Sequence, residues 1–581
     1  MRRMSGTFVL MTFLIILAVA AAVRLANLGV VSRLPIADYQ RTWSEADMAF
    51  NWTWSGRILQ GDVLGRDTVH EDTDWMHEIA PVETWQRWWG GPHVFYQAPL
   101  YPYTLAAMRR VAGDGFWGVG LCQALLGVSS VALVYLLAAR LFGPAVAAIA
   151  GFGAALYGPL LLHEPFLIRD SLAVTTSLLL LWWLTRCEES AGRWLVAGMF
   201  FVAAVLARES ALLFAPFVAL WLVQRFRTRP RTLGRVSLAF VAGAALAFAP
   251  LVARNVAVGA PPLSFSTRAV EIFLIGNAVD TAVIGVKIPA ATRTVLEHAD
   301  GHLGRAIRLT LATYEGDWKR LLANEWLKLR AIFAGYEAMD DVNWYYFADR
   351  SPVLRFSLRY DVVVALGVLG LWLDRRNAAR HRLLWYFLIA TVGGLMYGTI
   401  AGRYRLPIAA VLLVYAAMAV VWLAREIADG RWRPAAIAGA TALAIGVISA
   451  HLLPTAERQS RYRPDEFFMA ARAYYERGDQ RHAYDELESA LDHAYAGPDQ
   501  PTLPARYENL ITLPFVRVAH ELGRDADAAT VLERLATVHP KDAGVEQLLG
   551  FVYRDGLGKT DEGQRHFARA ETLGAESLGT P

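Results

Sequence analysis

The chain has 581 residues, of which 55% are hydrophobic and only 19% are charged. Soluble domains carry about 25% charged residues, so this composition argues against an ordinary soluble enzyme and indicates a membrane protein. The net charge of +4 comes from arginines scattered between apolar runs, so no concentrated basic surface for nucleic acid is predicted.

Eleven apolar runs are predicted to cross a membrane, because a spanning helix needs about twenty mostly apolar residues. The first run is too long for a cleaved signal sequence. The two runs on either side of Arg208-Glu209 fit either a hairpin of short helices or one long broken helix. The predicted spans are 8–28, 117–138, 145–162, 170–185, 194–207, 210–224, 236–252, 360–373, 383–400, 406–424 and 434–453.

Arginines are unevenly distributed between the short loops, and this predicts the topology. The short loops and helix flanks on the same side of the membrane as the N-terminus are rich in arginine. This bias predicts that the N-terminus lies in the cytoplasm. Eleven crossings then put the long loops 29–116 and 254–359, and the C-terminal tail, on the outer side, the periplasm in a bacterial inner membrane. The outer short loops hold four exceptions, each of which needs a reason such as an anionic partner. They are Arg169, Arg208, Arg403 and Arg405.

The expected fold is therefore all-α and polytopic, with a transmembrane domain over 1–455. From Pro464 the sequence becomes polar, and small and aromatic residues recur at the spacing of tetratricopeptide helical hairpins. Two to three such repeats are predicted in a periplasmic domain over 461–581. They provide either a surface for a protein partner or a brace for the membrane domain.

The second long loop contains a predicted amphipathic helix from Asp317 to Phe333. Its aromatic and aliphatic side chains fall near helical spacing, with lysines and arginines among them. Such a helix lies in the membrane interface or packs on the core of its own loop.

A carboxylate in the first long loop is the candidate base. Asp47, Phe50 and Trp54 fall on one face of a predicted helix, whereas Glu45 does not share that face. The structural alternative is a capping box, because Ser44-x-x-Asp47 has the spacing at which such side chains satisfy the first helical amides.

Short motifs in a fixed order resemble bacterial membrane glycosyltransferases of the C-type superfamily, in the group of protein O-mannosyltransferases and aminoarabinose transferases. The resemblance covers about residues 8–425, and fusion to tetratricopeptide repeats is familiar in that group. The motifs are Asp47 with Trp54-Ser55-x-x-Ile58, Gly61-Asp62-x-Leu64-Gly65, Ala98-Pro99-Leu100-Tyr101-Pro102-Tyr103, Tyr157-Gly158-Pro159 to Glu164, Leu206-Ala207-Arg208-Glu209, Arg254-Asn255, Ile275-Gly276-Asn277, Lys328 with Gly335-Tyr336-Glu337, and Arg403-Tyr404-Arg405-Leu406-Pro407.

The resemblance implies an inverting transferase that moves a sugar from a polyprenyl-phosphate donor to a lipid, glycan or protein acceptor in the periplasm. In that group an external-loop aspartate, here Asp47, deprotonates the acceptor hydroxyl. The leaving phosphate is already a stable anion, so one base and cationic groups suffice without a general acid. Asp47 is followed by Met48 where the O-mannosyltransferases carry a glutamate. The sugar and the acceptor therefore stay open.

Cationic residues at the outer ends of spans are the candidate phosphate ligands. Arg403 and Arg405 precede Pro407 at a helix N-terminus, where free amides also favour an anion. Their alternative role is contact with lipid head groups. The other candidate ligands are Arg208, Arg254 and Lys328, although Arg208 equally fits a pair with a nearby carboxylate. The candidates for acceptor binding or support are Glu164, Glu45, Tyr404 and Glu337.

No cofactor or metal ligand is assigned from the sequence. An acidic and histidine-rich cluster in the first loop lacks regular spacing, so dependence on a divalent cation stays open. It comprises His70, Glu71, Asp72, Asp74, His77 and Glu78.

Two other functions fit parts of the pattern. A transporter of lipid-linked oligosaccharides needs cations deep inside spans, and few are present beyond Arg24. An envelope-assembly scaffold would act through the repeats.

Overall fold

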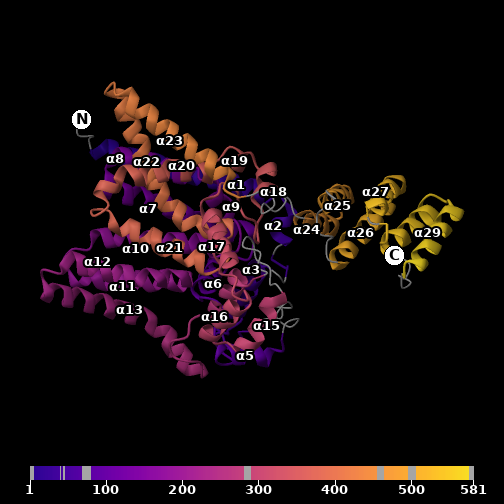
Figure 1. Cartoon of the computed structure of the whole chain (residues 1–581), viewed down its shortest axis with the longest axis horizontal. Helices are drawn as coiled ribbons and strands as arrows, with labels where there is room; N and C mark the ends of the chain where they lie inside the picture. Colours follow the sequence, from indigo (N-terminus) through magenta and orange to yellow (C-terminus); the bar gives the residue numbers. More distant parts are fainter. Residues whose placement is uncertain are drawn as a thin grey trace. The chain divides into compact units, whose positions relative to one another are not determined.

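The computed structural model describes residues 6–39, 41–43, 46–68, 80–279, 290–453, 464–494, 505–538 and 540–574. Within these ranges the regular elements are helices, and one isolated parallel bridge joins Tyr157 to Leu358 (Figure 1). The predicted all-α fold is confirmed. The chain forms two compact units. Unit 1 is Met1–Ser32 with Arg41–Arg458, and unit 2 is Arg33–Gln40 with Gln459–Pro581.

Six helices of unit 1 are long and apolar enough to cross a membrane: Gly6–Val31, Phe116–Phe142, Glu209–Phe226, Pro230–Val258, Gly402–Ala428 and Trp432–His451. Three shorter apolar helices, Pro144–Ala155, Ala191–Ala207 and Arg382–Tyr397, also fall on predicted spans. A multi-pass membrane protein follows, whereas eleven crossings and their orientation stay predictions. The helices on the predicted spans are α1 (Gly6–Val31), α7 (Phe116–Phe142), α8 (Pro144–Ala155), α10 (Asp170–Arg186), α11 (Ala191–Ala207), α12 (Ala215–Phe226), α13 (Pro230–Val258), α20 (Tyr360–Asp374), α21 (Arg382–Tyr397), α22 (Leu406–Ala428) and α23 (Trp432–His451).

The chain breaks at two places where the sequence predicted apolar spans. The predicted span 145–162 is wrong as one helix, because α8 ends at Ala155 and the short helix α9 (Gly158–His163) starts after the Tyr157 bridge. At the second break Arg208 is extended, and the 3₁₀ helix η1 (Glu209–Phe214) leads into α12. The Trp194 ring lies 5.7 Å from that of Trp221, so the start of α11 meets the end of α12. The hairpin is therefore the correct alternative.

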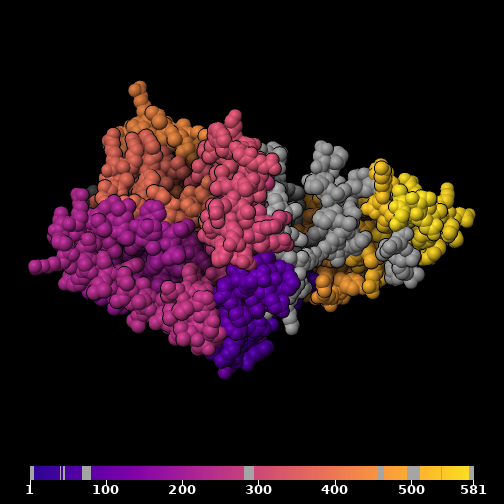
Figure 2. Space-filling view, turned by 60° about the horizontal axis from the view of Figure 1, so that its bottom comes forward, coloured from indigo at the N-terminus to yellow at the C-terminus, as the bar shows by residue number. Residues whose placement is uncertain are grey.

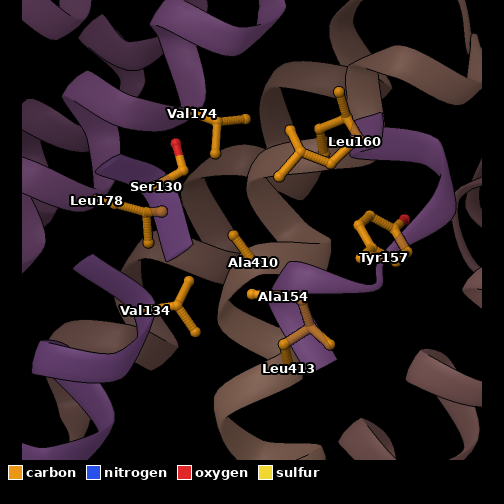
Figure 3. Close-up of a pocket in the computed structure, with 10 residues that line it drawn as sticks. Ser130, Val134, Ala154, Tyr157, Leu160, Val174, Leu178, Ala410 and Leu413 are labelled. Atoms are coloured by element: carbon orange, nitrogen blue, oxygen red, sulfur yellow. The ribbon is translucent and has the colours of Figure 1, made fainter. Parts of the chain in front are cut away.

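Helix α22 is the centre of the bundle. Its side chains are buried on all sides, including Val411, Val414 and Tyr415. Outer helices instead expose leucines such as Leu238 and Leu443, as helices facing lipid do. Beside α22 the packing leaves a cavity of about 10 Å³, lined mostly by aliphatic side chains (Figure 3). That space is at the lower limit for one water molecule, so the bundle centre is not a substrate site.

Two glycines let α11 and α13 approach closely. A Cβ atom at Gly198 would overlap the backbone carbonyl of Phe240, and one at Gly243 would overlap that of Leu195. Small residues at such crossings are the usual means by which membrane helices pack backbone to backbone.

We expect Gly243→Ala to destabilise unit 1 by about 1–3 kcal/mol, because the added methyl group forces the two helices apart. Gly234→Ala on the same helix is the matched control, since a Cβ atom there meets no atom within 4 Å. Thermal unfolding of the detergent-solubilised protein measures both. Equal midpoints for the two variants would contradict the close helix contact.

The two long loops of unit 1 pack on each other through an aromatic core. Phe50, Trp54 and Trp85 of the first loop share this core with Leu274 and Leu296 of the second. Figure 2 shows the indigo and pink segments meeting on one face. The first loop contains α3 (Asp47–Leu59), α5 (Val82–Trp89) and α6 (Leu100–Ala112). The second contains α14 (Ala269–Asn277), α15 (Ala290–Ala299), α16 (Leu303–Ala312), α17 (Trp318–Phe333), α18 (Trp344–Arg350) and α19 (Pro352–Arg355).

The amphipathic helix predicted in the second loop is confirmed as α17. It begins after Asp317, whose side chain accepts from the backbone amide of Arg320. Trp318, Leu322 and Trp326 are exposed on it. Its position in the membrane interface stays a prediction.

In its described residues, unit 2 contains three helix pairs and one short helix from near the N-terminus. Consecutive helices of the pairs pack on each other, in agreement with the predicted hairpins. Their assignment as tetratricopeptide repeats stays a prediction. The helices are α2 (Pro35–Tyr39), α24 (Pro464–Glu476), α25 (Gln480–Ala494), α26 (Ala505–Glu521), α27 (Asp525–Val538), α28 (Ala543–Phe551) with a π turn (Val552–Gly556), and α29 (Thr560–Thr572).

Candidate active site

The guanidinium of Arg403 joins four carboxylates from distant parts of unit 1. Arg403 lies in the 3₁₀ helix η3 (Gly402–Arg405) before α22. Its Nη2 donates to Asp47 Oδ2 at 2.7 Å and its Nε to Asp340 Oδ2 at 2.7 Å. Its Nη1 lies 3.0 Å from Asp341 Oδ2 and 3.6 Å from Asp170 Oδ2. The side chain of Arg403 is only 4% exposed, so these carboxylates replace water around a buried cation.

Asp47 occupies the first position of α3. Ala46 is the N-cap, and its side chain makes no capping hydrogen bond. The capping-box alternative involves Ser44 and stays a prediction. Ser44 and Glu45 lie outside the described residues. The Asp47 side chain is 22% exposed, and its Oδ1 lies 3.6 Å from Arg268 Nη1. Its carboxylate thus bridges two arginines and keeps a face open to solvent.

The predicted apolar stripe behind Asp47 is confirmed. The rings of Phe50 and Trp54 lie 5.6 Å apart, edge to face, and both are buried in the aromatic core of the two loops. This packing fixes the direction of α3 and thereby holds its first residue at the cluster.

Arg208 and Tyr404 extend the cluster on the side of Asp170. Arg208 Nη1 donates to Asp170 Oδ1 at 2.6 Å. The Tyr404 ring contacts both arginines, with its centre 4.5 Å from the Arg208 guanidinium and 5.2 Å from that of Arg403. Arg208 and Tyr404 therefore both lie at the site. Arg208 also forms a pair with a nearby carboxylate, which was the alternative to a role in phosphate binding.

The pKa values of two aspartates in the cluster are shifted in opposite directions. Burial alone would raise the pKa of Asp47, but the Arg403 and Arg268 guanidiniums hold it well below its usual range. Burial, with the carboxylates of Asp47 and Asp340, raises the pKa of Asp341 well above its usual range despite Arg403. The surroundings therefore favour the ionised form of Asp47 and the protonated form of Asp341.

Arg405 uses its donors on the protein itself. It is fully buried and donates to the carbonyls of Ala334 and Tyr336 and to Glu337 Oε2 at 2.6 Å. This arrangement favours a structural role for Arg405 and its partner Glu337 over the predicted phosphate and acceptor roles.

Arg254 and Lys328 are committed to the protein in the same way. Arg254 donates to the carbonyls of Leu64 and His93 at 2.6 Å each and also to that of Gly65, which fixes the first loop. Lys328 Nζ donates to Asn277 Oδ1 at 2.7 Å and to Glu325 Oε1 at 2.8 Å. Neither side chain offers the open donors that phosphate binding needs.

Glu164 forms a buried ion pair with Arg24. Its Oε1 accepts from Arg24 Nη2 at 2.8 Å, and both side chains are buried. A Cβ atom at Gly127 would overlap both, so this glycine makes room for the ion pair. This pair favours a structural role for Glu164, and its role in acceptor binding stays a prediction.

Sequence reasoning missed Asp170, Asp340, Asp341 and Arg268. The available signal was the expectation that each outer arginine needs an anionic partner, which Asp170 provides for Arg208 and Arg403. Among the residues that the structure describes, no group of three or more His, Cys, Asp or Glu side chains is arranged to hold a metal ion. The acidic and histidine-rich cluster at 70–78 lies outside those residues.

A comparison with protein families matches residues 96–253 to the family described as dolichyl-phosphate-mannose-protein mannosyltransferase. This segment includes Asp170 and Arg208 of the site. The match supports the resemblance to C-type membrane glycosyltransferases. No curated protein matches the chain.

Solved structures of the Archaeoglobus fulgidus oligosaccharyltransferase show a distant similarity. Against the AglB complex with an inhibitory peptide and a dolichol-phosphate, the identity is 15% and the TM-score 0.36, covering 79% of this chain and 59% of that chain. Against the apo form, the identity is 16% and the TM-score 0.36, covering 85% and 59%. The chain thus spans less than two thirds of these proteins, and the proposal below does not rest on them.

Arg254→Lys tests the structural role assigned to Arg254. One ammonium group cannot reach the three carbonyls that the guanidinium binds, so we expect a loss of about 1.5–3 kcal/mol and faster proteolysis of the first loop. Arg231→Lys, at an exposed position on the same helix, is the matched control. A raised KM for a phosphate-linked donor with unchanged proteolysis would instead favour phosphate binding.

Proposed function

We propose that the protein is an inverting glycosyltransferase that moves a sugar from a polyprenyl-phosphate donor to a hydroxyl of a lipid, glycan or protein acceptor. The reaction takes place on the periplasmic side of a bacterial inner membrane. The family match over residues 96–253 and the apolar helices of unit 1 support this class of enzyme. Asp47 carries the proposal, because it is an ionised and partly exposed carboxylate beside buried arginines.

Asp47 is the general base. Its carboxylate takes the proton from the acceptor hydroxyl, and the oxygen attacks the anomeric carbon of the donor sugar. The bond from that carbon to the phosphate oxygen breaks, and polyprenyl phosphate leaves as an anion. No proton has to be given to the leaving group, so one carboxylate suffices.

Arg403 and Arg208 receive the phosphate. Both guanidiniums contact the Tyr404 ring and both lie at the Asp170 carboxylate, so the two cations are close enough together for one phosphate to contact both. The raised pKa of Asp341 favours its neutral form, which carries no negative charge against the phosphate. When the phosphate takes donors of Arg403, Asp47 loses its strongest partner and its basicity rises.

The transporter alternative finds no comparable support. Arg24, the cation that lies deep in a predicted span, is neutralised by Glu164 in a buried pair. A charge held in this way offers no stepwise path for an anion.

Asp47→Asn and Asp341→Asn form a matched pair of variants with opposite outcomes. Asp47→Asn should lower kcat at least a hundredfold, because an amide cannot accept the acceptor proton. Asp341→Asn should stay within about threefold of the native rate, because the amide resembles a protonated carboxyl group. The measurement is product formation with purified protein, a panel of polyprenyl-phosphate sugars and equal folding checked by thermal unfolding. Native turnover by Asp47→Asn would remove Asp47 as the base.

The pH profile tests the ionisation of Asp47 separately. Since the pKa of Asp47 is lowered, its base form is fully present above the usual aspartate range and persists into acid. We expect kcat/KM, which reports the free enzyme, to change by no more than about twofold between pH 7 and pH 5. A loss of about tenfold over that interval would identify a base that titrates near neutrality instead.

A further inference from the structure

Arg268 brings a second cation to Asp47, from a different part of unit 1 than Arg403. Arg268 directly precedes α14 in the second long loop, whereas Arg403 lies in η3 before α22. Arg403 Nη2 donates to Asp47 Oδ2 at 2.7 Å, and Arg268 Nη1 lies 3.6 Å from the other oxygen, Oδ1. Each oxygen of the carboxylate therefore has its own arginine.

Few other groups compete for Arg268. Among the described residues, Asp47 is the carboxylate with which it forms an ion pair. Arg268 Nη1 also donates a long hydrogen bond of 3.5 Å to Gln97 Oε1, and the buried Nε has no hydrogen-bond partner in the described part of the chain. Nearby Glu271 is engaged by the Tyr96 hydroxyl, which lies 2.9 Å from both of its oxygens. Burial raises the pKa of Glu271, which favours its neutral form. Arg268 is therefore left to Asp47.

Arg403 and Arg268 differ in their distance from the proposed phosphate position. Arg403 lies with Arg208 at the Asp170 carboxylate, where the proposed mechanism places the phosphate. Within the described residues, Arg268 forms no ion pair with Asp170. When the phosphate takes donors of Arg403, the contact at Oδ2 of Asp47 weakens and the contact at Oδ1 remains.

The remaining contact matters because a general base has to keep one oxygen aimed at the proton that it accepts. A carboxylate that has lost its main partner rotates more freely about its bond to the chain, and ordering it again costs conformational entropy. Misplacement of a reacting group by about 1 Å costs on the order of a hundredfold in rate. An arginine that stays in place during donor binding limits this freedom.

The same contact limits how far the proton affinity of Asp47 rises. Burial raises the pKa of Asp47, and the guanidiniums of Arg403, Arg268 and Arg169 lower it, in that order of size. With Arg403 engaged by phosphate, Arg268 is the strongest of the remaining cations, so its loss would raise the pKa of Asp47 and remove the base form at a higher pH during acidification. The acidic groups around Asp47 and its arginines are Asp170, Asp340, Asp341, Glu209, Glu271, Tyr96 and Tyr404.

We propose that Arg268 is a positioning residue, which holds the Asp47 carboxylate at Oδ1 while the donor phosphate occupies Arg403. The inference rests on the proposed function for its effect on turnover. The pairing of Arg268 with Asp47 does not depend on that function. Arg268 acts through Asp47 and binds no phosphate, so its loss changes the chemical step and leaves the affinity for the donor nearly unchanged.

Arg268→Gln in the full chain, reconstituted in lipid nanodiscs, removes the charge and keeps a polar side chain. We expect kcat to fall about tenfold at pH 8 with the KM for the donor within about threefold. Between pH 7 and pH 5 we expect a further loss of about tenfold in kcat, which reports the donor complex, against at most about threefold for the native protein. The kcat/KM profile, which reports the free enzyme with Arg403 still on Asp47, should change less.

Arg305→Gln is the matched control, since Arg305 is exposed on α16 of the same loop. It should keep the native kcat at every pH. A merely structural role for Arg268 would lower the unfolding temperature and kcat without changing the shape of the pH profile. A kcat profile of Arg268→Gln parallel to the native one therefore overturns the proposal, and so does a donor KM raised more than tenfold with native kcat.

Arg268→Lys is the second variant, in case Arg268→Gln fails to fold. The ammonium group keeps the charge but lacks the fixed fork of the guanidinium. We expect kcat to be about three- to tenfold below the native value, with the native dependence on pH. A native kcat in this variant overturns the positioning role.

Labelling of Asp47 by a water-soluble carbodiimide tests the pairing without any sugar transfer, because the reagent reacts with a protonated carboxyl group. Mass spectrometry of the Asp47 peptide should show labelling at pH 5 at least about threefold faster in Arg268→Gln than in the native protein and in Arg305→Gln. If the native protein transfers no sugar while Arg268→Gln still accelerates labelling, the proposed function fails and the pairing stands. If the native protein transfers sugar and Arg268→Gln changes neither the kcat profile nor the labelling, positioning by Arg268 fails and the proposed function stands.

Discussion

A buried guanidinium needs several acceptors at once, and this need organises unit 1. Water cannot reach Arg403, and an isolated charge in such surroundings is costly, so its donors must meet protein oxygens. Asp47, Asp340, Asp341 and Asp170 supply them from the first loop, the second loop and α10. If one of these segments moved away, the buried guanidinium of Arg403 would lose one of its acceptors. The ion pairs of Arg403 therefore determine both the charges of the proposed site and the way in which the loops meet there.

Arginines that bind carbonyl oxygens fix the loops around this centre. Arg254 spans the first loop and Arg405 the end of α17, each with more than one carbonyl oxygen. Irregular backbone needs such partners when it is buried, because no helix satisfies its polar groups. The planar guanidinium suits this task, since its donors point in fixed directions and reach several acceptors together. Arg254 and Arg405 therefore hold the shape of the loops.

The helices could be predicted because the bilayer demands long apolar segments that satisfy their own backbone. The apolar stripe from Asp47 to Trp54 could be predicted from the helical period, which is also a local property of the sequence. The breaks after α8 and at Arg208 lie in apolar sequence and depend on tertiary contacts, such as the bridge from Tyr157 to Leu358.

The roles of the arginines could be predicted only in part. Arg403 and Arg405 are two residues apart and share the same sequence context, yet one meets the site aspartates and the other meets backbone carbonyls. Their directions diverge because they lie on different sides of η3, and their partners are more than sixty residues away in sequence. No local pattern contains that information. Pairing each outer arginine with an acid was the correct principle, but spacing alone could not name the acid.

The sharing of Arg403 has a consequence for how substitutions combine. Groups that contact one another through a common partner show interaction energies, so their effects do not add. Removing one aspartate frees a donor that its neighbours can take up, and it shifts their proton affinities in the same step. The effects of substitutions at these aspartates are therefore expected to be epistatic. Single replacements will misstate the weight of each acid, and double replacements are needed to measure how the acids share the arginine.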